Sequence, residues 1–259
     1  MRCQVLSSGS RGNSTLVRMG ETSILVDAGL TPRQMRERIT AAGISFKGLD
    51  HILVTHGHLD HARSAGVIAK QHDATVHCPN SLLRARSVVR APRLAAIHIG
   101  ETTSLEGQGE PMTYLPVLLP HDCDPPVAYR IEYGDRSLGI LTDMGRPDDK
   151  VAASLHGVNV LILEFNHDEE MLEAGPYPAP LKKRILGDRG HLSNAQAARM
   201  LEQLAGPDLH TVVLAHLSAH NNTPDLARRA AEETLARLGR TDVRVEIASQ
   251  DEVGESMTV

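Results

Sequence analysis

Four side chains of the kinds that bind divalent metal ions gather in one short stretch, residues 55–64 (THGHLDHARS). His56 and His58 are two residues apart, so in an extended loop they project to the same side and can converge on one cation. Asp60 and His61 follow, where the chain turns into a helix, and they face a second cation. Imidazole and carboxylate groups suit zinc, manganese or iron. So many ligand-type groups at a strand end have no use in packing, and the stretch predicts a metal site.

One loop cannot complete two coordination spheres, so further ligands must come from other strand ends. His121, Asp143 and His216 each stand where an apolar run meets a loop. A rigid sheet that carries polar groups on its loops is the usual arrangement of a catalytic site. Taken singly, each of the three fits equally well as a solvated strand-end residue. Together with the cluster at 56–61, they are better explained as ligands.

These residues predict a dinuclear site with two divalent cations per chain. The ligands form two sets: His56, His58 and His121 for one metal, and Asp60, His61 and His216 for the other. Asp143 bridges them, because the two oxygens of a carboxylate can hold cations about 3.5–4 Å apart. A water or hydroxide between the metals is the expected nucleophile, since two positive charges lower its pKa. Asp27, which ends the run TSILVD, fits equally as an acceptor that orients a ligand imidazole or as a turn residue.

The elements that must position these side chains begin as a meander of strands and continue as strands alternating with helices. Apolar runs predict strands at 3–6, 14–19, 22–27, 51–55, 74–78, 112–119, 127–134, 136–143, 158–164, 211–216 and 242–248. Helices are predicted at 32–42, 61–71, 80–90, 147–156, 194–205 and 224–238, with helical pieces over 167–188. This order predicts an α/β fold, an αββα sandwich of two mixed sheets with helices outside. No linker rich in Pro, Gly or Ser divides the chain, so residues 1–259 are expected to form one domain.

The composition excludes several classes of protein. Three cysteines in 259 residues (Cys3, Cys78 and Cys123) cannot make a disulfide framework and lack the spacing of a zinc ribbon. No apolar run approaches the roughly 20 residues of a membrane span, and the start of the chain lacks the apolar core of a signal peptide. A cytoplasmic protein without a membrane partner is therefore expected. A net charge of −5 argues against coating nucleic acid by bulk positive charge.

At this point the sequence resembles the metallo-β-lactamase superfamily. Five motifs match in order: Asp27, the cluster at 56–61, His121, Asp143 and His216. Members of that superfamily include lactamases, thioesterases, flavodiiron proteins and nucleases. Further segments are similar to its YycJ/WalJ branch: SSGSRGNSTLV (7–17), LTDMG (141–145), LEFNHDEEML (163–172), LKKRILGDRGHLSNAQAA (181–198) and LAHLSAHNNTP (214–224). That resemblance implies a bacterial metal-dependent hydrolase of phosphodiester bonds that acts as a 5′→3′ exonuclease on double-stranded DNA. The expected binding partner is therefore nucleic acid.

The branch is also similar to tRNase Z in one feature, a Glu–His pair beside the metals, which Glu164 and His191 match. Glu164 ends the apolar run VNVLILE, and His191 precedes a predicted helix cap. The resemblance implies that Glu164 holds His191 protonated and that His191 protonates the leaving oxygen of a phosphodiester. Spacing alone favours an ordinary surface histidine at position 191. Asp60 is counted with this pair as catalytic as well as a ligand.

Two departures disfavour tRNA as the substrate. No counterpart of the long flexible arm of tRNase Z is evident, and the interval from Asp143 to His216 is too short for the inserted domain of β-CASP nucleases. The alternative function is a small-molecule hydrolase of the same fold, either a cyclic phosphodiesterase or a thioesterase. A thioesterase has no clear need for a Glu–His proton donor, because a thiolate leaves readily.

Substrate contacts are indicated more weakly. The candidates are polar residues in turns near the motifs: Ser10, Asn13, Arg189, Asn221 and Asn222. Hairpin and left-handed turn geometry explains several of them equally well. Two basic clusters, at 84–93 and 182–189, are either a phosphate track or solvated helix faces. His167 follows Glu164 closely, and the sequence assigns it no role.

Overall fold

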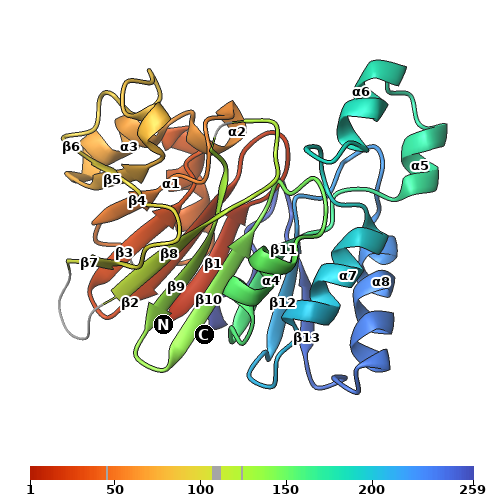
Figure 1. The fold of residues 1–259 in the computed structure, drawn as a ribbon. Coiled ribbons are helices and arrows are strands. Elements are labelled where there is room, and N and C mark those ends of the chain that lie inside the picture. The colour runs from red at the N-terminus through yellow and green to blue at the C-terminus, as the bar shows by residue number, and fades with distance from the viewer. Residues whose placement is uncertain (45, 107–111, 124) are drawn as a thin grey trace.

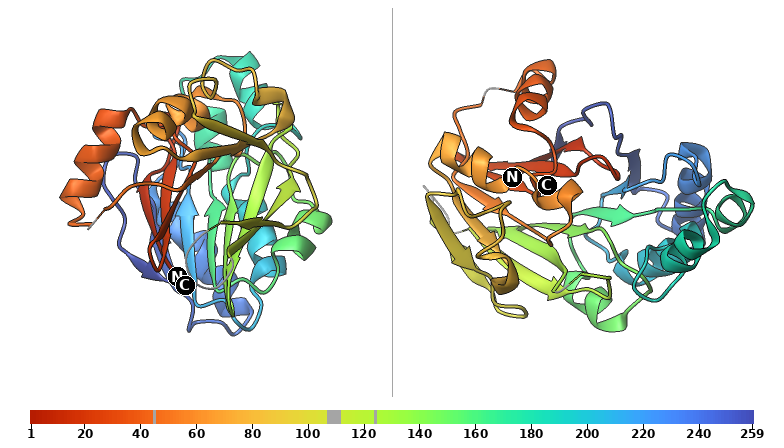
Figure 2. Two further views of the ribbon diagram at one scale, coloured as in Figure 1. Left: turned by 90° about the vertical axis from the view of Figure 1, so that its left-hand side faces the viewer. Right: turned by 90° about the horizontal axis from the view of Figure 1, so that it is seen from above.

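The computed structural model describes residues 1–44, 46–106, 112–123 and 125–259. Over these residues the chain forms two seven-stranded sheets that face each other, with helices on their outer sides (Figure 1). Two further views show the sheets as the inner layers of a sandwich (Figure 2). The predicted αββα sandwich is therefore confirmed.

The first sheet has the order β14-β1-β2-β3-β4-β5-β6. Its strands are β1 (Arg2–Ser7), β2 (Ser14–Met19), β3 (Thr22–Val26), β4 (His51–Leu53), β5 (Thr75–Cys78), β6 (Arg93–Ala96) and β14 (Met257–Thr258). β1 to β3 form an antiparallel meander, and β3 to β6 are parallel. Parallel strands need crossovers, which here contain α1 (Pro32–Ala41), α2 (Leu59–Ala62) and α3 (Ala65–His72). Thr31 caps α1 with a capping box, and Pro32 occupies its first position.

The second sheet has the order β13-β12-β11-β10-β9-β8-β7. Its strands are β7 (Thr103–Leu105), β8 (Met112–Leu118), β9 (Val127–Tyr133), β10 (Arg136–Leu141), β11 (Val160–Glu164), β12 (Thr211–Ala215) and β13 (Arg244–Ile247). β7 to β10 are antiparallel, and β10 to β13 are parallel. Its helices are α4 (Asp149–Leu155), α5 (Glu169–Ala174), α6 (Ala179–Ile185), α7 (Asn194–Leu204) and α8 (Pro224–Arg237).

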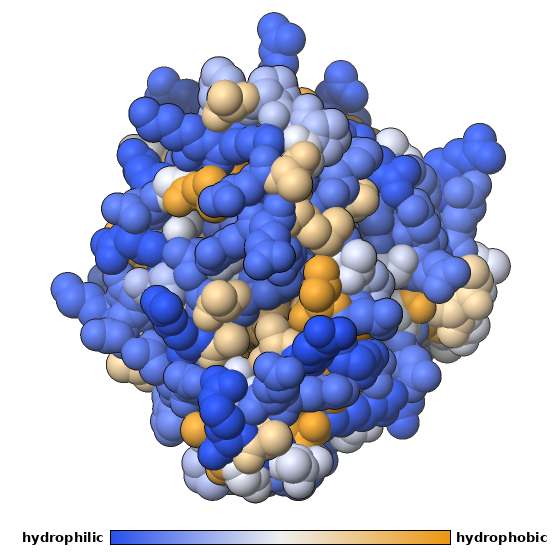
Figure 3. Space-filling model, turned by 90° about the vertical axis from the view of Figure 1, so that its right-hand side faces the viewer, coloured by the Kyte–Doolittle hydropathy of each residue, from blue (hydrophilic) through white to orange (hydrophobic). Residues whose placement is uncertain are grey.

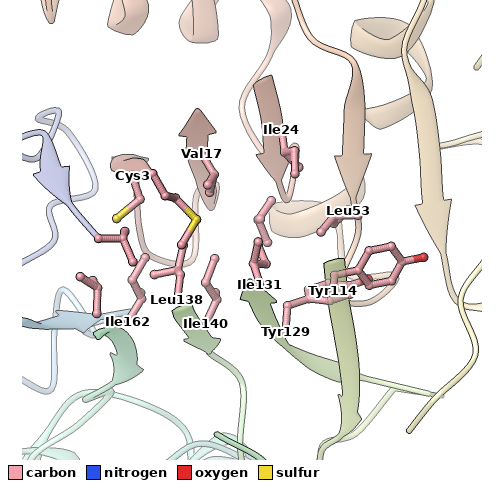
Figure 4. Packing of buried hydrophobic residues seen from close by; sticks show 14 of the residues in the cluster. Cys3, Val17, Ile24, Leu53, Tyr114, Tyr129, Ile131, Leu138, Ile140 and Ile162 are labelled. Atoms are coloured by element: carbon pink, nitrogen blue, oxygen red, sulfur yellow. The ribbon is translucent and has the colours of Figure 1, made fainter. Parts of the chain in front are cut away.

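Three apolar clusters hold these layers together. The first lies between the sheets, where Cys3 and Ile24 of the first sheet face Leu138 and Ile131 of the second (Figure 4). The second packs α4, α7 and α8 on the second sheet, and the third packs α1 and α3 on the first. Each large apolar side chain that is fully buried contributes about 1.5–3 kcal/mol. The clusters therefore make both sheets a rigid base for polar loops.

The strand directions bring the ends of six strands to one edge of the sandwich. β3 and β4 are parallel in the first sheet, as are β10, β11 and β12 in the second. β8 is antiparallel to β9, and β9 is antiparallel to β10, so β8 runs in the same direction as β10. Polar residues that follow these strands meet at their carboxyl ends. α5 and α6 stand out from the body beside this edge (Figure 1).

The helix predicted over 80–90 is wrong. The structure has a short 3₁₀ helix, Asn80–Leu82, and then turns as far as β6. The segment is held by short-range turn hydrogen bonds, such as Ala85 N to Leu82 O at 2.7 Å, and the carbonyl of Ser87 accepts from Gly66 N of α3 at 2.7 Å. A Cβ on Gly66 would lie 2.8 Å from a carbonyl of that segment, so only glycine permits this contact.

Other differences from the prediction are smaller. The helix predicted over 61–71 is divided into α2 and α3, because Ser64 N donates to Ala28 O (2.9 Å) between them. Strands β6, β7 and β14 were not predicted; β6 is half-exposed and contains an arginine and two alanines, which gives little strand signal. A hairpin turn at Gly134-Asp135 joins β9 to β10, and φ at Gly134 is 59°.

The two termini lie side by side (Figure 2), where Val259 N donates to Met1 O at 3.0 Å. The face that carries α5 to α8 is mainly hydrophilic, with apolar side chains scattered over it (Figure 3). Within the described ranges, no helix combines the length and the apolar character that crossing a bilayer requires.

Candidate metal centre

Three polar residues at this edge have left-handed backbone conformations. The φ angle is 60° at Asp27, 62° at Asp143 and 57° at His216, each one or two residues after a parallel strand. Among the described non-glycine residues only Asp73 shares such an angle, and it is an ordinary helix C-cap. Left-handed residues cost of order 1–3 kcal/mol and persist only where the surroundings hold them. This concentration of strain is typical of a functional site.

The first predicted ligand set comes together. Ring nitrogens of His56, His58 and His121 lie within 4.8 Å of one another, and His56 Nε2 is 3.0 Å from His58 Nδ1. His56 Nδ1 lies 3.0 Å from Thr55 Oγ1. His121 Nδ1 donates to Gly190 O at 2.9 Å. A neutral imidazole that donates through Nδ1 keeps a lone pair on Nε2, so His121 presents Nε2 as its ligand atom.

The second predicted set also comes together, on the other side of the loop. Ligand-type atoms of Asp60, His61 and His216 lie within 4.8 Å of one another. The distances from Asp60 Oδ2 are 3.6 Å to His61 Nε2 and 3.8 Å to His216 Nε2. Asp27 Oδ2 accepts from His61 Nδ1 at 2.7 Å, and Thr55 N donates to Asp27 Oδ1 at 2.8 Å. Asp27 thus holds the His61 ring with Nε2 toward the centre.

Asp143 lies between the two sets. Its Oδ2 is 2.9 Å from His61 Nε2, and its Oδ1 is 3.6 Å from His216 Nδ1 and 3.8 Å from His121 Nε2. Burial raises the pKa of this carboxyl group, but the facing His216 and His61 outweigh burial and hold it well below its usual range. A buried, ionised carboxylate that faces both sets has the geometry of a bridging ligand.

Two of these histidines have a buried nitrogen to which no described residue is hydrogen-bonded, which bears on whether the residues fit a metal ion. Among the described residues, His121 Nε2 and His216 Nε2 are buried without a hydrogen-bond partner. Buried polar atoms of that kind cost about 1–3 kcal/mol each unless something binds them. In each of these two rings the other nitrogen, Nδ1, already has a hydrogen-bond partner, and Nε2 faces a carboxylate. The donor set therefore fits divalent cations that coordinate imidazole and carboxylate.

Glu164 and His191 form a pair beside these residues. Glu164 is fully buried at the end of β11, and its Oε1 accepts from His191 Nδ1 at 2.8 Å and from His216 Nδ1 at 3.0 Å. Its Oε2 accepts from Met144 N (2.9 Å) and Leu192 N (3.2 Å). Burial raises the pKa of Glu164, but His191 and His216 outweigh burial and lower it to about 2. Burial lowers the pKa of His191, but Glu164 outweighs burial and raises it.

The glycine-rich turn after β1 is hydrogen-bonded to the loop that carries Asp60 and His61. Asn13 N donates to Asp60 O at 2.7 Å, and Ala28 N donates to His61 O at 2.6 Å. A Cβ on Gly29 would lie 1.7 Å from Asp60 O, so no larger residue fits there. The Asn13 side chain is buried, with Nδ2 2.9 Å from His61 Nε2 and Oδ1 accepting from the turn. In this conformation Asn13 therefore positions the loop and does not reach a substrate.

The remaining substrate candidates differ in exposure. Ser10 and Arg189 are exposed, and Arg189 Nε donates to His121 O at 2.8 Å. Asn221 and Asn222 are buried. Asn222 bonds through its side chain to Asn194 and to backbone groups, so it joins the loops that follow β11 and β12. Only Ser10 and Arg189 among the five candidates are placed to meet a large substrate.

Sequence reasoning missed several polar residues of the centre. Asp122 Oδ1 lies 3.3 Å from His121 Nε2 and 3.5 Å from His58 Nε2. Cys123 Sγ lies within 4.8 Å of ligand nitrogens of the first set. In the sequence, the only feature that marks Asp122 and Cys123 is that they directly follow His121. His167 is 1% exposed, and neither ring nitrogen has a hydrogen-bond partner among the described residues.

The chain is similar to known proteins over nearly its whole length. A family model described as the metallo-beta-lactamase superfamily matches residues 8–216. The exodeoxyribonuclease YycJ of Bacillus anthracis is 32% identical over 91% of this chain and 89% of its own length. The exodeoxyribonuclease WalJ of Streptococcus pneumoniae is 31% identical over 90% of this chain and 87% of its own. The solved structure of the metallo-beta-lactamase fold protein YhfI from Bacillus subtilis has a TM-score of 0.70 and 17% identity, and covers 99% of this chain and 98% of that chain.

Proposed function

The chain belongs to the metallo-beta-lactamase superfamily, and on that basis we propose that it is a nuclease that hydrolyses phosphodiester bonds in DNA. The observation that carries the proposal is the Glu164–His191 pair beside two converging ligand sets. Two relatives of similar length, YycJ and WalJ, are named exodeoxyribonucleases, which supports DNA as the substrate. Action in the 5′→3′ direction on double-stranded DNA, in the cytoplasm, is part of the proposal, as is one domain over residues 1–259.

The two ligand sets and Asp143 are proposed to hold two divalent cations, zinc or manganese, with iron fitting the same ligands. When bound, such a pair lowers the pKa of water and neutralises charge on a phosphodiester. Asp27 orients His61, and Glu164 orients His216, each through an Nδ1 hydrogen bond. Fixing a ligand ring in this way also raises its basicity. Asp60 is proposed to serve both as a ligand and as a catalytic residue at the open side of the loop.

His191 is proposed to protonate the leaving oxygen. Its Nδ1 is held by Glu164, its side chain is 19% exposed, and its pKa is raised by that carboxylate. Nδ1 remains with Glu164, so the other ring nitrogen, Nε2, delivers the proton. Two backbone N–H groups stabilise the Glu164 carboxylate, which therefore stays ionised while His191 gives up its proton. A positioned general acid of this kind contributes about 10²–10⁴-fold to a rate.

The substrate is proposed to lie along α6 and the loop after it. Lys182, Lys183, Arg184 and Arg189 lie on this segment, between Glu164 and His191 in the chain. Lys183 and Arg189 are exposed, whereas Arg184 forms an ion pair with Asp122. Because α5 and α6 stand away from the body (Figure 1), a duplex can follow them into the site. The other basic cluster, at 84–93, lies over turns and β6 instead of the predicted helix.

A panel of substrates tests the proposal. It compares labelled duplex DNA with a 5′-phosphate, single-stranded DNA, RNA, bis-p-nitrophenyl phosphate and a glutathione thioester, each with Zn²⁺ and with Mn²⁺. We expect duplex DNA to be degraded fastest, and the Asp143→Asn variant to be inactive at nearly unchanged side-chain volume. Hydrolysis of the thioester, or of the small phosphodiester alone, without cleavage of any nucleic acid would overturn the proposal in favour of a small-molecule hydrolase.

A further inference from the structure

We infer that Cys123 is a further protein ligand, in addition to the bridging Asp143, of the metal ion that His56, His58 and His121 hold. The inference deepens the proposed function, because it rests on the proposed metal centre and assigns that position a donor set of three nitrogens and one sulfur beside the bridging carboxylate. The other position, formed by Asp60, His61 and His216, has no sulfur donor within the described residues. The two positions would therefore differ in the metal that they prefer.

The Cys123 thiol lies close to the ring nitrogens of the three histidines. Cys123 Sγ and one ring nitrogen from each of the three histidines all lie within 4.8 Å of one another, so a single ion can contact all four. Cys123 is half-buried, at the rim of the space that these nitrogens face. His121 is 1% exposed, and its Nε2 has no hydrogen-bond partner in the described part of the chain. A buried lone pair of that kind, directed at the same space as the thiol, is what an ion would satisfy.

The two residues before Cys123 are held in place by contacts with α6 and the segment after it. His121 Nδ1 donates to Gly190 O at 2.9 Å, and Arg189 Nε donates to His121 O at 2.8 Å. Asp122 forms an ion pair with Arg184 on α6. These contacts tie the loop after β8 to the segment after α6. Such hydrogen bonds around a metal site orient the ligands and are normally needed for full affinity.

The kinds of ligand atom at the two positions determine which metal each position prefers. Thiolate sulfur is a soft ligand that favours zinc, whereas carboxylate oxygen also suits manganese. On binding, the S–H bond of Cys123 breaks, its proton goes to the solvent, and a sulfur–metal bond forms. Three imidazoles and one thiolate are all ligand types that zinc prefers, and with the bridging Asp143 they give a five-coordinate site, a number that zinc also accepts. We therefore expect this position to keep zinc when the protein is dialysed against excess manganese, while the other position exchanges.

Cobalt substitution tests the inference without reference to activity. The whole protein is stripped with a chelator, loaded with Co²⁺ and examined by absorption spectroscopy. A thiolate–cobalt bond gives a near-ultraviolet charge-transfer band, which we expect in the wild type and in Cys3→Ser, whose cysteine lies at the start of β1. We expect Cys123→Ser to lose this band while its visible d–d bands and its two cobalt ions per chain remain. Alkylation of Cys123 by iodoacetamide should be slow in the metal-loaded protein and fast after stripping.

Each outcome bears on the inference. Two bound cobalt ions without a charge-transfer band in the wild type would overturn it, as would a band that persists in Cys123→Ser. If no cobalt binds at all, the inference and the metal centre fail together. If the band is present but no DNA is cleaved with any metal, the proposed function fails while the assignment of Cys123 stands.

Discussion

Single residues carry the proposed chemistry, and their contacts separate ligands from proton donors. His61, His121 and His216 each engage Nδ1 with an oxygen acceptor and direct Nε2 toward the centre. His191 engages Nδ1 with Glu164 in the same way, but it lies outside the two predicted ligand sets. A histidine whose pKa is raised by a neighbouring carboxylate is suited to general acid catalysis, and this is the role that we propose for His191.

His191→Ala tests that separation of roles. We expect turnover on duplex DNA to fall by about 10²–10⁴-fold, because the leaving oxygen would depart without a positioned acid. Metal content, measured by plasma mass spectrometry, should stay at the wild-type value, and the exposed His98→Ala variant should match the wild type in both measurements. Loss of metal from His191→Ala would show instead that His191 is a ligand.

A second histidine away from the centre makes stability depend on pH. His77 is buried between the sheets, with Nε2 3.0 Å from His51 Nδ1 and Nδ1 3.2 Å from Tyr114 Oη. Burial, followed by the neighbouring His51, lowers the pKa of His77 from 6.5 to about 4. The folded state therefore binds fewer protons than the unfolded state between these values. The stabilisation is fully present above pH 6.5 and is lost as the pH falls toward 4.

The expected size of this effect is about 3 kcal/mol of unfolding free energy over that pH range. Urea unfolding at a series of pH values measures it. His77→Gln should flatten the dependence relative to the wild type, whereas the same change at the exposed His98 should not. Parallel curves for the wild type and His77→Gln would contradict the assignment to His77.

At the scale of elements, strand direction determines which residues meet. β3, β4, β8, β10, β11 and β12 end at one edge, and every residue of the two ligand sets follows one of these strands. The amino-acid sequence predicted these strand ends because each is an apolar run that stops at a polar residue. It could not predict the left-handed angles at Asp27, Asp143 and His216, because the sequence signal for such a conformation is glycine. Nor could it choose between the two roles left open for Asp27.

The proposed binding of DNA along α6 leads to a prediction at this scale. Reversing two charges with Lys182→Glu and Lys183→Glu should raise KM for duplex DNA by roughly tenfold with little change in kcat. It should also reduce the dependence of log affinity on log salt by about two, since each phosphate contact contributes about 0.9. Arg2→Glu with Arg136→Glu is a charge-matched control at the opposite edge of the sheets. Equal effects of the two pairs would show that net charge, and not α6, governs binding.

At the scale of the whole molecule, the sequence predicted the sandwich, which the structure confirms, and two ligand sets, whose residues the structure places close together. The layers followed from the order of strongly patterned elements. Residues 80–90 were predicted as a helix because the pairing of Ser87 with Gly66 is a tertiary contact without a local signal. Asp122 and Cys123 were missed because a single residue beside a ligand forms no pattern. The Glu164–His191 pair was reached only through the resemblance, since its two members lie far apart in the chain.

The centre also joins the two sheets, which predicts that metal stabilises the whole molecule. Asp60 and His61 follow a strand of the first sheet, and Asp143 and His216 follow strands of the second. Each ion present at 1,000 times its Kd contributes about 4 kcal/mol to stability, so two ions contribute about 8 kcal/mol. For a chain of this size, removing both with a chelator should lower Tm by roughly 20 °C. A Tm that does not respond to the chelator in calorimetry would contradict a metal link between the sheets.

The central claim is that seven side chains from both sheets jointly hold two cations. Anomalous X-ray diffraction from crystals of the metal-loaded protein, recorded at the absorption edge of the bound metal, tests it most directly. We expect two anomalous peaks about 3.5–4 Å apart, one among His56, His58 and His121, the other among Asp60, His61 and His216, with Asp143 between them. A single peak, or peaks away from these residues, would contradict the account.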